Sequence, residues 1–127
     1  MDSAENAGRN WSNWIEIPVE EFERAQSFYE TIFDIEIQVM DLGALKMGIF
    51  PGRTVGCAIC KGVHYAPGAS GPVVYLDANP DLEVVQQRIL SAGGKVLMAK
   101  KQISPEHGFM ALFQDTEGNR LALHSNH

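Results

Sequence analysis

The sequence predicts an α+β fold made of two βαβββ modules that form a cupped mixed sheet. Three observations predict this fold class. The order strand, helix and three strands occurs twice along the 127 residues. The two halves align after a shift of sixty residues, so that both helices begin and end together. Segments rich in Gly, Pro and Asp separate the expected strands.

Composition limits the classes of function. A hydrophobic fraction of 45% and a charged fraction of 20% are ordinary for one globular domain. The net charge is -6 and the ten Lys and Arg are scattered, which argues against binding to nucleic acid or to an anionic membrane surface. No apolar run approaches a membrane span, and the first residues do not resemble a signal peptide. We therefore expect a cytoplasmic protein.

The first module is expected at about 11–62, after a flexible polar tail at 1–10. "NWIEIPV" (13–19) predicts a strand that leaves its sheet at Pro18. "EEFERAQSFYETIF" (20–33) predicts a helix with one apolar face. Three short strands should follow, and they are "IEIQVM" (35–40), "ALKMGIF" (44–50) and "TVGCAIC" (54–60), with turns at 41–43 and 51–53. A Gly-rich loop at 62–71 connects the halves.

The second module is expected at about 72–127, within a single domain that spans 11–127. Its first strand is "PVVYLDA" (72–78). A helix should follow with Asn79 as N-cap and Pro80 at its first position, and Gly93-Gly94 should stop it. The last strands are "KVLMAK" (95–100), "GFMALFQD" (108–115) and "NRLALHS" (119–125). Each module covers one sheet face with its helix, so we expect the open apolar faces to pair and enclose a binding cavity.

Two cysteines are spaced as C-A-I-C, at Cys57 and Cys60. This spacing occurs in redox motifs and in half of many zinc sites, but no second Cys or His pair stands at zinc-finger spacing. On a strand the two side chains would point to opposite faces. We expect small buried hydrophobes and keep the redox role as the alternative. His64 and Tyr65 lie in one expected loop and His107 lies in another, and either loop could cover a pocket mouth.

Three segments resemble the vicinal-oxygen-chelate superfamily, which includes glyoxalase I, extradiol dioxygenases, fosfomycin-resistance enzymes and bleomycin-resistance proteins. They are "IEIPVEEFERAQSFYETIFDIEI", "GPVVYLDANPDLEVVQQRILSAGGKV" and "FMALFQDTEGNRLAL". The resemblance implies a glyoxalase-like fold and a homodimer, since members of this family commonly pair modules across chains. In the metal-using members it implies a divalent ion held by His, Gln or Glu from the first strand of each half and from the last strands.

The resemblance also assigns the metal-ligand positions to residues of this chain. They fall on Trp14, Val74 and Ala122, and a fourth lies on the strand around 56–60. Indole and hydrocarbon side chains cannot coordinate a divalent ion. We therefore expect no metal cofactor, and a divalent metal only if the site is rearranged.

Strand alternation selects the other candidate residues. Glu16 shares a strand face with Trp14, and His124 shares one with Ala122. A carboxylate inside an apolar pocket often has a functional role, although Glu16 could also pair with a neighbour at the pocket edge. Trp14 could offer a flat wall to a ring or could be plain core. His124 could donate or accept a hydrogen bond in the pocket, or lie in solvent near the C-terminus.

These residues support three hypotheses. The first is a metal-free protein of the glyoxalase/bleomycin-resistance type that binds a small apolar or aromatic molecule through Trp14, Glu16 and His124. The second is a lyase or isomerase of the glyoxalase type with Glu16 as general base, with or without a rearranged metal site. The third is an assembly or regulatory subunit, which would have a sealed cavity. The identity of the ligand does not follow from the sequence.

Overall fold

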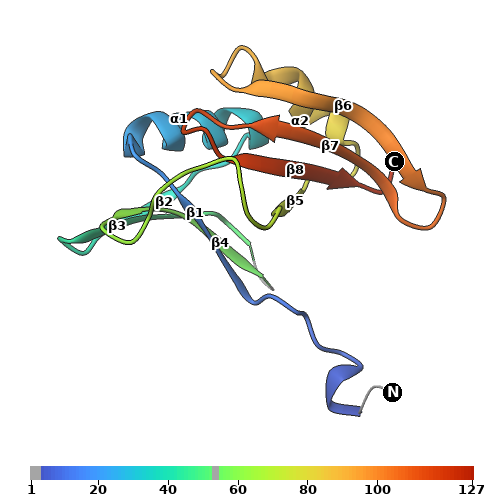
Figure 1. Ribbon diagram of the computed structural model, residues 1–127, viewed down its shortest axis with the longest axis horizontal. Coiled ribbons are helices and arrows are strands. Elements are labelled where there is room, and N and C mark those ends of the chain that lie inside the picture. Colours follow the sequence, from blue (N-terminus) through green and yellow to red (C-terminus); the bar gives the residue numbers. More distant parts are fainter. Residues whose placement is uncertain (1–3, 53–54) are drawn as a thin grey trace.

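The computed structural model describes residues 4–52 and 55–127 as two four-stranded sheets and two α-helices (Figure 1). The strands of sheet A are β1 (Trp14–Pro18), β2 (Gln38–Asp41), β3 (Leu45–Ile49) and β4 (Gly56–Gly62). The strands of sheet B are β5 (Tyr75–Asp77), β6 (Lys95–Ser104), β7 (Gly108–Gln114) and β8 (Arg120–Ser125). Their orders, β1-β4-β3-β2 and β5-β8-β7-β6, are equivalent, with the first strand parallel to the last. The α+β fold of two βαβββ modules is thereby confirmed.

The N-terminal tail leads away from the two sheets (Figure 1). Its described part is exposed except for Asn6, which is half-buried, and contains a 3-10 turn at Ala4–Asn6. Met1 to Ser3 of the predicted tail lie outside the described residues, as do Arg53 and Thr54 of the predicted turn and strand. Neither α-helix of the described part is long and apolar enough to cross a membrane. The predicted cytoplasmic location stays a prediction.

The hydrophobic core lies between the two sheets and contains both helices, α1 (Phe22–Phe33) and α2 (Leu82–Ile89). The helices contact each other, α1 packs on sheet A, and α2 packs on sheet B. Ile17 and Ile59 of sheet A belong to the same buried cluster as Phe113 and Leu123 of sheet B. The helix-covered faces therefore look toward each other, and the two helix-free faces look outward.

We call these helix-free surfaces open face A and open face B. Open face A contains Trp14, Glu16, Met47, Ile49, Ala58 and Cys60. Open face B contains Tyr75, Asp77, Met110, Leu112, Arg120, Ala122 and His124. The two faces look in different directions over most of their area, and they come together where Glu16 of open face A and Arg120 of open face B line one pocket. The apolar stripes of α1 and α2 pack against each other and determine how the modules meet.

The start of α2 differs from the prediction. Asp81 is the N-cap, because its carboxylate accepts a hydrogen bond from the backbone N–H of Glu83 at 3.0 Å, and the helix begins at Leu82. The predicted cap at Asn79 was wrong. Asn79 uses its side chain to bind Asp77 and the backbone N–H of Asn126. The regular helix ends at Ile89, before the predicted stop, and a turn follows that closes at Gly93 with a φ of 107°, where the N–H of Gly94 donates to the carbonyl of Ile89.

Candidate functional site

The carboxylate of Glu16 is the centre of a polar cluster on open face A. Tyr65 donates its hydroxyl to Oε1 of Glu16 at 2.7 Å, and the indole N–H of Trp14 donates to Oε2 at 3.1 Å. Tyr65 comes from the loop at 63–72 that follows β4, and its ring folds back onto the strand at Gly62. We call these three residues the Glu16 cluster. The structure thus brings two predicted site residues together and adds a third.

These two hydrogen bonds set the protonation states of the cluster. The bond from Tyr65, and next the bond from Trp14, lower the pKa of Glu16 below its usual value, although partial burial opposes them. The same bond to Glu16, together with burial, raises the pKa of Tyr65 to about 12. At neutral pH the cluster therefore holds an ionised carboxylate and a neutral phenol. An ionised carboxylate accepts hydrogen bonds well but is a weak base.

Trp14 lies across the backbone of β4. Its register partner is Gly56, and a Cβ atom added there would overlap with Cε3 and Cζ3 of the indole. Only glycine at this position leaves the indole room to lie flat and reach Glu16. The position of Trp14, where the resemblance implied a metal ligand, is thus filled by an aromatic ring that lies over a glycine.

Replacing Gly56 by Ala should displace the indole of Trp14, because overpacking at a filled site costs about 1–3 kcal/mol or forces a new rotamer. We expect a shift in the emission of Trp14 in a Trp11→Phe background, and a rise in the pKa of Glu16 measured by carboxylate NMR. Gly8→Ala is the matched control, since no atom lies within 4 Å of its position. Unchanged spectra in Gly56→Ala would contradict the placement of the indole.

The two cysteines lie on opposite sides of sheet A, as predicted. Cys57 packs against the core, while Cys60 pairs with Pro18 and Met47 and is buried on open face A. Burial raises the pKa of both thiols to about 12, and the charge of Glu16 adds to the effect at Cys60. Both thiols are free and neutral, so they are poor nucleophiles and the redox alternative gains no support.

A pocket of about 400 Å³ lies beside the Glu16 cluster, between β1, the loop at 63–72 and the start of β8. Most of its walls are apolar, and the side chains include Pro18, Pro67 and Val74. Its two charged residues are Glu16 and Arg120. We call it the Glu16 pocket. Its volume lies within the range of pockets that hold small molecules.

The loop at 63–72 is held over this pocket by three hydrogen bonds. Besides the bond from Tyr65 to Glu16, the N–H of Gly68 donates to the side chain of Asn119 at 3.0 Å. Nη2 of Arg120 donates to the carbonyl of Gly71 at 2.7 Å. His64 in the same loop is exposed. The loop therefore closes one side of the pocket, although through Tyr65 and the backbone and not through the histidine.

His124 lies apart from the Glu16 cluster, on open face B. It is paired in register with Asp77, and its Nε2 approaches the carbonyl oxygen of His107 at 2.6 Å. The backbone N–H of His107 donates to Ser104 Oγ at 3.0 Å, which closes the turn between β6 and β7. Within one chain both histidines thus take part in contacts that hold the end of sheet B together.

The other predicted positions are also separated. Ala122 is fully buried on open face B and pairs with Tyr75, whereas Val74 packs against the core. The first strand of the second module ends one residue farther from its helix than that of the first module. Val74 therefore lies on the opposite face from Trp14, and Tyr75, which pairs with Ala122, corresponds to Glu16, which pairs with Ala58. Within the described ranges, no group of three His, Cys, Asp or Glu could hold a metal ion.

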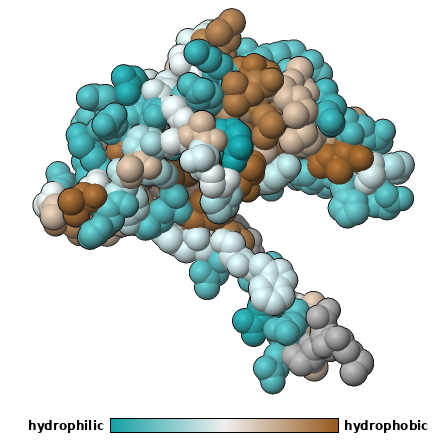
Figure 2. Space-filling model, viewed as in Figure 1, coloured by the Kyte–Doolittle hydropathy of each residue, from teal (hydrophilic) through white to brown (hydrophobic). Residues whose placement is uncertain are grey.

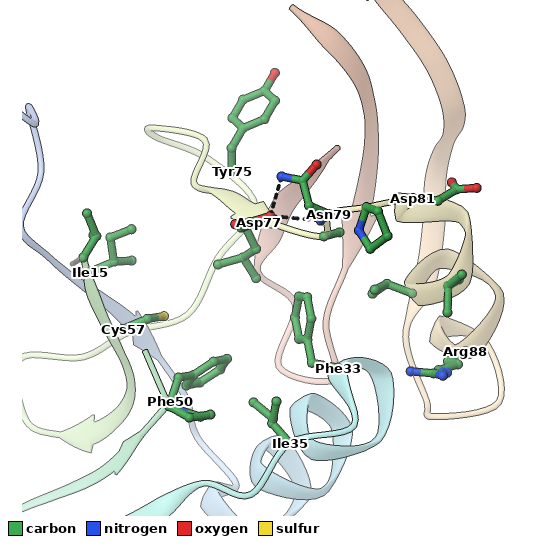
Figure 3. Close-up of a pocket in the computed structure, with 17 residues that line it drawn as sticks. Ile15, Phe33, Ile35, Phe50, Cys57, Tyr75, Asp77, Asn79, Asp81 and Arg88 are labelled. Atoms are coloured by element: carbon green, nitrogen blue, oxygen red, sulfur yellow. Dashed lines mark hydrogen bonds between the residues drawn. The ribbon is translucent and has the colours of Figure 1, made fainter. Parts of the chain in front are cut away.

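A larger cleft of about 530 Å³ separates the two modules on their helix sides (Figure 3). Its wall on the first module is apolar and includes Phe33, Ile35 and Phe50, while Asp77 and Arg88 lie on the other wall. Asp77 accepts two hydrogen bonds from Asn79, and Nη1 of Arg88 donates to the carbonyl of Ile32. The cleft holds none of the predicted site residues. Its polar groups stabilise the fold, so we place the candidate site in the Glu16 pocket.

The sequence did not single out Arg120 for this pocket. It has the same strand parity as Ala122 and His124, so alternation could have placed it on the same face. Tyr65 was expected only in a loop that could cover a pocket mouth. Its hydrogen bond to Glu16 had no signal in the sequence, because an irregular loop determines where its ring goes.

The sequence matches no protein-family model and no curated protein. Solved structures are similar over most of the chain. A glyoxalase/bleomycin resistance protein from Albidiferax ferrireducens has a TM-score of 0.71 at 13% identity, over 90% of this chain and 97% of that one. A glyoxalase-related enzyme from Fulvimarina pelagi has a TM-score of 0.69 at 14% identity, over 93% and 89%. Glyoxalase I from Zea mays, in a mutant form, has a TM-score of 0.67 at 18% identity, and the match spans 45% of its length.

Proposed function

We propose, on the basis of this glyoxalase-like fold and its Glu16 pocket, that the chain is a small-molecule-binding protein of the glyoxalase/bleomycin-resistance type. The observation that carries the proposal is the Glu16 carboxylate, held by Tyr65 and Trp14 at the edge of an apolar pocket. Such a pocket takes up an apolar or aromatic body, and a fixed carboxylate selects its orientation. An open pocket of about 400 Å³ also favours binding over the sealed cavity of an assembly subunit.

We further propose that binding needs no metal. Divalent ions require imidazole, carboxylate or thiolate donors. The side chains at the expected positions do not fit a metal ion, because Trp14 has only an N–H, Ala122 has no ligand atom and Val74 packs against the core. On the strand at 56–60, Cys57 packs against the core and Cys60 is buried, and burial raises the pKa of both thiols to about 12. The ionised Glu16 is a single carboxylate whose two oxygens already accept hydrogen bonds.

The lowered pKa of Glu16 favours a binding role for this residue over a role as a catalytic base. A general base works best when its pKa lies near the operating pH. Since Tyr65 and Trp14 lower the pKa of Glu16, its carboxylate is better suited to hold a donor than to remove a proton. The lyase or isomerase of the glyoxalase type is therefore the second candidate, and it would need a ligand that displaces Tyr65.

Glu16→Gln should weaken binding of a small aromatic compound, selected by thermal shift, by about tenfold or more, because hydrogen bonds to a charged group contribute about 1.5–3 kcal/mol. Titration calorimetry on protein stripped with a chelator measures this directly. Glu36→Gln is the control, since that side chain is exposed. If Glu16→Gln and Glu36→Gln bind the compound with equal affinity, Glu16 does not contribute to the binding site. Binding that appears only after a divalent metal is added refutes the metal-free proposal.

We also propose that the protein is a homodimer in which open face A of one copy covers open face B of the other. Both faces expose large apolar side chains, with Trp14 at 42% and Tyr75 at 48% exposure. Figure 2 shows hydrophobic side chains over sheet B and at the end of the β2–β3 hairpin. His124 on open face B carries ring nitrogens and the Glu16 cluster on open face A carries a carboxylate, so the two faces also have complementary polar groups.

Light scattering after size exclusion tests the dimer. We expect twice the chain mass for the native protein and a single chain mass for Met47→Glu, which places a charge on open face A. Val63→Glu makes the same charge change at a residue that is 89% exposed in the loop, and it should stay dimeric. A native protein that remains monomeric at high concentration would contradict the proposed pairing.

A further inference from the structure

Arg120 has a buried donor with no partner. Its Nη2 donates to Gly71, but Nε is inaccessible and has no hydrogen-bond partner among the residues that the structure describes. A guanidinium carries five donors in a rigid fork, and an unpaired buried donor costs about 1–3 kcal/mol. Native structures rarely leave such a group unsatisfied. The geometry therefore calls for an acceptor that reaches Arg120 from the Glu16 pocket.

The pocket offers opposite charges at two places. Arg120 and Glu16 both line it, and none of the three ion pairs of the described chain involves either of them. Glu16 accepts hydrogen bonds from the neutral side chains of Tyr65 and Trp14. Most of the remaining wall of the pocket is apolar. The complementary ligand has one anionic group, one cationic group and an apolar substituent.

We propose that the Glu16 pocket binds an amino-acid-like zwitterion, with its carboxylate on Arg120 and its ammonium on Glu16. Bidentate binding of a carboxylate by the Arg fork satisfies Nε, and a carboxylate that already accepts two hydrogen bonds can still receive an ammonium. The side chain of the ligand lies against Pro18, Pro67 and Val74. This inference rests on the proposed small-molecule function and names its ligand class.

The loop at 63–72 takes part in this binding. Two of its three hydrogen bonds go to Glu16 and Arg120, the groups that would hold the zwitterion. Because Nη2 of Arg120 donates to the carbonyl of Gly71, a ligand carboxylate that binds both Nε and Nη2 must replace this bond, and the loop then moves away at Gly71. Binding therefore changes the surroundings of Gly68 and Gly71, whose backbone amides report on it.

An NMR titration of the full chain with three matched probes tests the proposal. The probes are L-phenylalanine, hydrocinnamate, which lacks the ammonium, and phenethylammonium, which lacks the carboxylate. We expect L-phenylalanine to bind at least about tenfold tighter than either probe and to shift the amides of Gly68 and Gly71, since a tenfold change corresponds to one charge-assisted contact. In Arg120→Gln, L-phenylalanine should bind no more tightly than phenethylammonium, because the site for its carboxylate is lost. In Glu16→Gln, L-phenylalanine should bind no more tightly than hydrocinnamate, because the site for its ammonium is lost.

Two further variants guard against simple misfolding. Lys95→Gln removes one positive charge from an exposed position and should bind like the native protein. Arg120→Lys keeps the charge but loses the fork, so it should bind L-phenylalanine more weakly than native and more tightly than Arg120→Gln. The proposal is overturned if the three probes bind equally, if L-phenylalanine does not bind at millimolar concentration, or if Arg120→Gln changes nothing. Binding of a neutral aromatic compound that depends on Glu16 but not on Arg120 would overturn this inference alone and leave the proposed function standing.

Discussion

Asp115→Ala is expected to lower the free energy of unfolding by about 3–5 kcal/mol, the largest effect of any single change considered for this chain. Asp115 is 3% exposed and its carboxylate accepts four hydrogen bonds. Oδ1 accepts from the backbone N–H groups of Glu117 and Asn119, and Oδ2 accepts from the hydroxyl of Tyr29 at 2.7 Å and from the amide of Asn119. Alanine leaves all four donors without this acceptor.

Urea unfolding followed by circular dichroism measures the loss. Glu106→Ala serves as the control, because that side chain is exposed in the turn between β6 and β7 and should change stability by less than about 0.5 kcal/mol. Tyr29→Phe removes one of the four bonds and should cost less than the full substitution. An Asp115→Ala protein as stable as the control would mean that the turn after β7 does not hold α1 to sheet B.

Glu117→Gln is expected to lower the free energy of unfolding by about 2–3 kcal/mol at neutral pH. Its carboxylate is fully buried and caps α1 from the turn between β7 and β8. It accepts hydrogen bonds from the N–H groups of Glu20 and Glu21, from Arg24 at 2.8 Å and from Thr116. Burial alone raises the pKa of Glu117, but the bonds from Arg24, Glu21, Glu20 and Thr116 outweigh it and lower the pKa to about 2.

The pH dependence gives this prediction a second readout. A lowering from 4.5 to about 2 corresponds to about 3 kcal/mol. Because the folded state has the lower pKa, this stabilisation is complete above pH 4.5 and is lost as the pH falls toward 2. The native protein and Glu117→Gln should therefore differ most at neutral pH and converge in acid. A constant difference from neutral pH to about pH 3 would assign the loss to packing and not to the charge.

The elements of the fold were predictable because they depend on local patterns. The spacing of Phe22, Ala25, Phe28, Tyr29 and Ile32 defines the buried face of α1, and Gly93-Gly94 closes the turn that follows α2. The turn at 117–119 connects β7 to β8 and carries Glu117. Its role in capping α1 was not predictable, because Glu117 reaches Glu20 and Glu21 only after the two modules have packed.

The site was predictable only in part. Alternation along one strand placed Glu16 beside Trp14, and the hydrogen bond between them follows from that spacing. Which open faces meet, where Tyr65 lies and how Arg120 enters the pocket all depend on tertiary packing. The sixty-residue shift between the modules placed Val74 wrongly. One additional residue before α2 turns the side chain of Val74 to the core, on the opposite face of the strand from the expected one.

The position of a bound ligand tests directly whether the Glu16 pocket is the binding site. We would titrate the labelled full chain with the small aromatic compound selected by thermal shift and map the backbone amides that move. We expect the backbone amide signals of Glu16, Tyr65, Gly68 and Arg120, around the Glu16 pocket, to shift. Shifts confined to Ile35, Val84 and Arg88 would place the ligand in the cleft between the modules and contradict the assignment of the site to open face A.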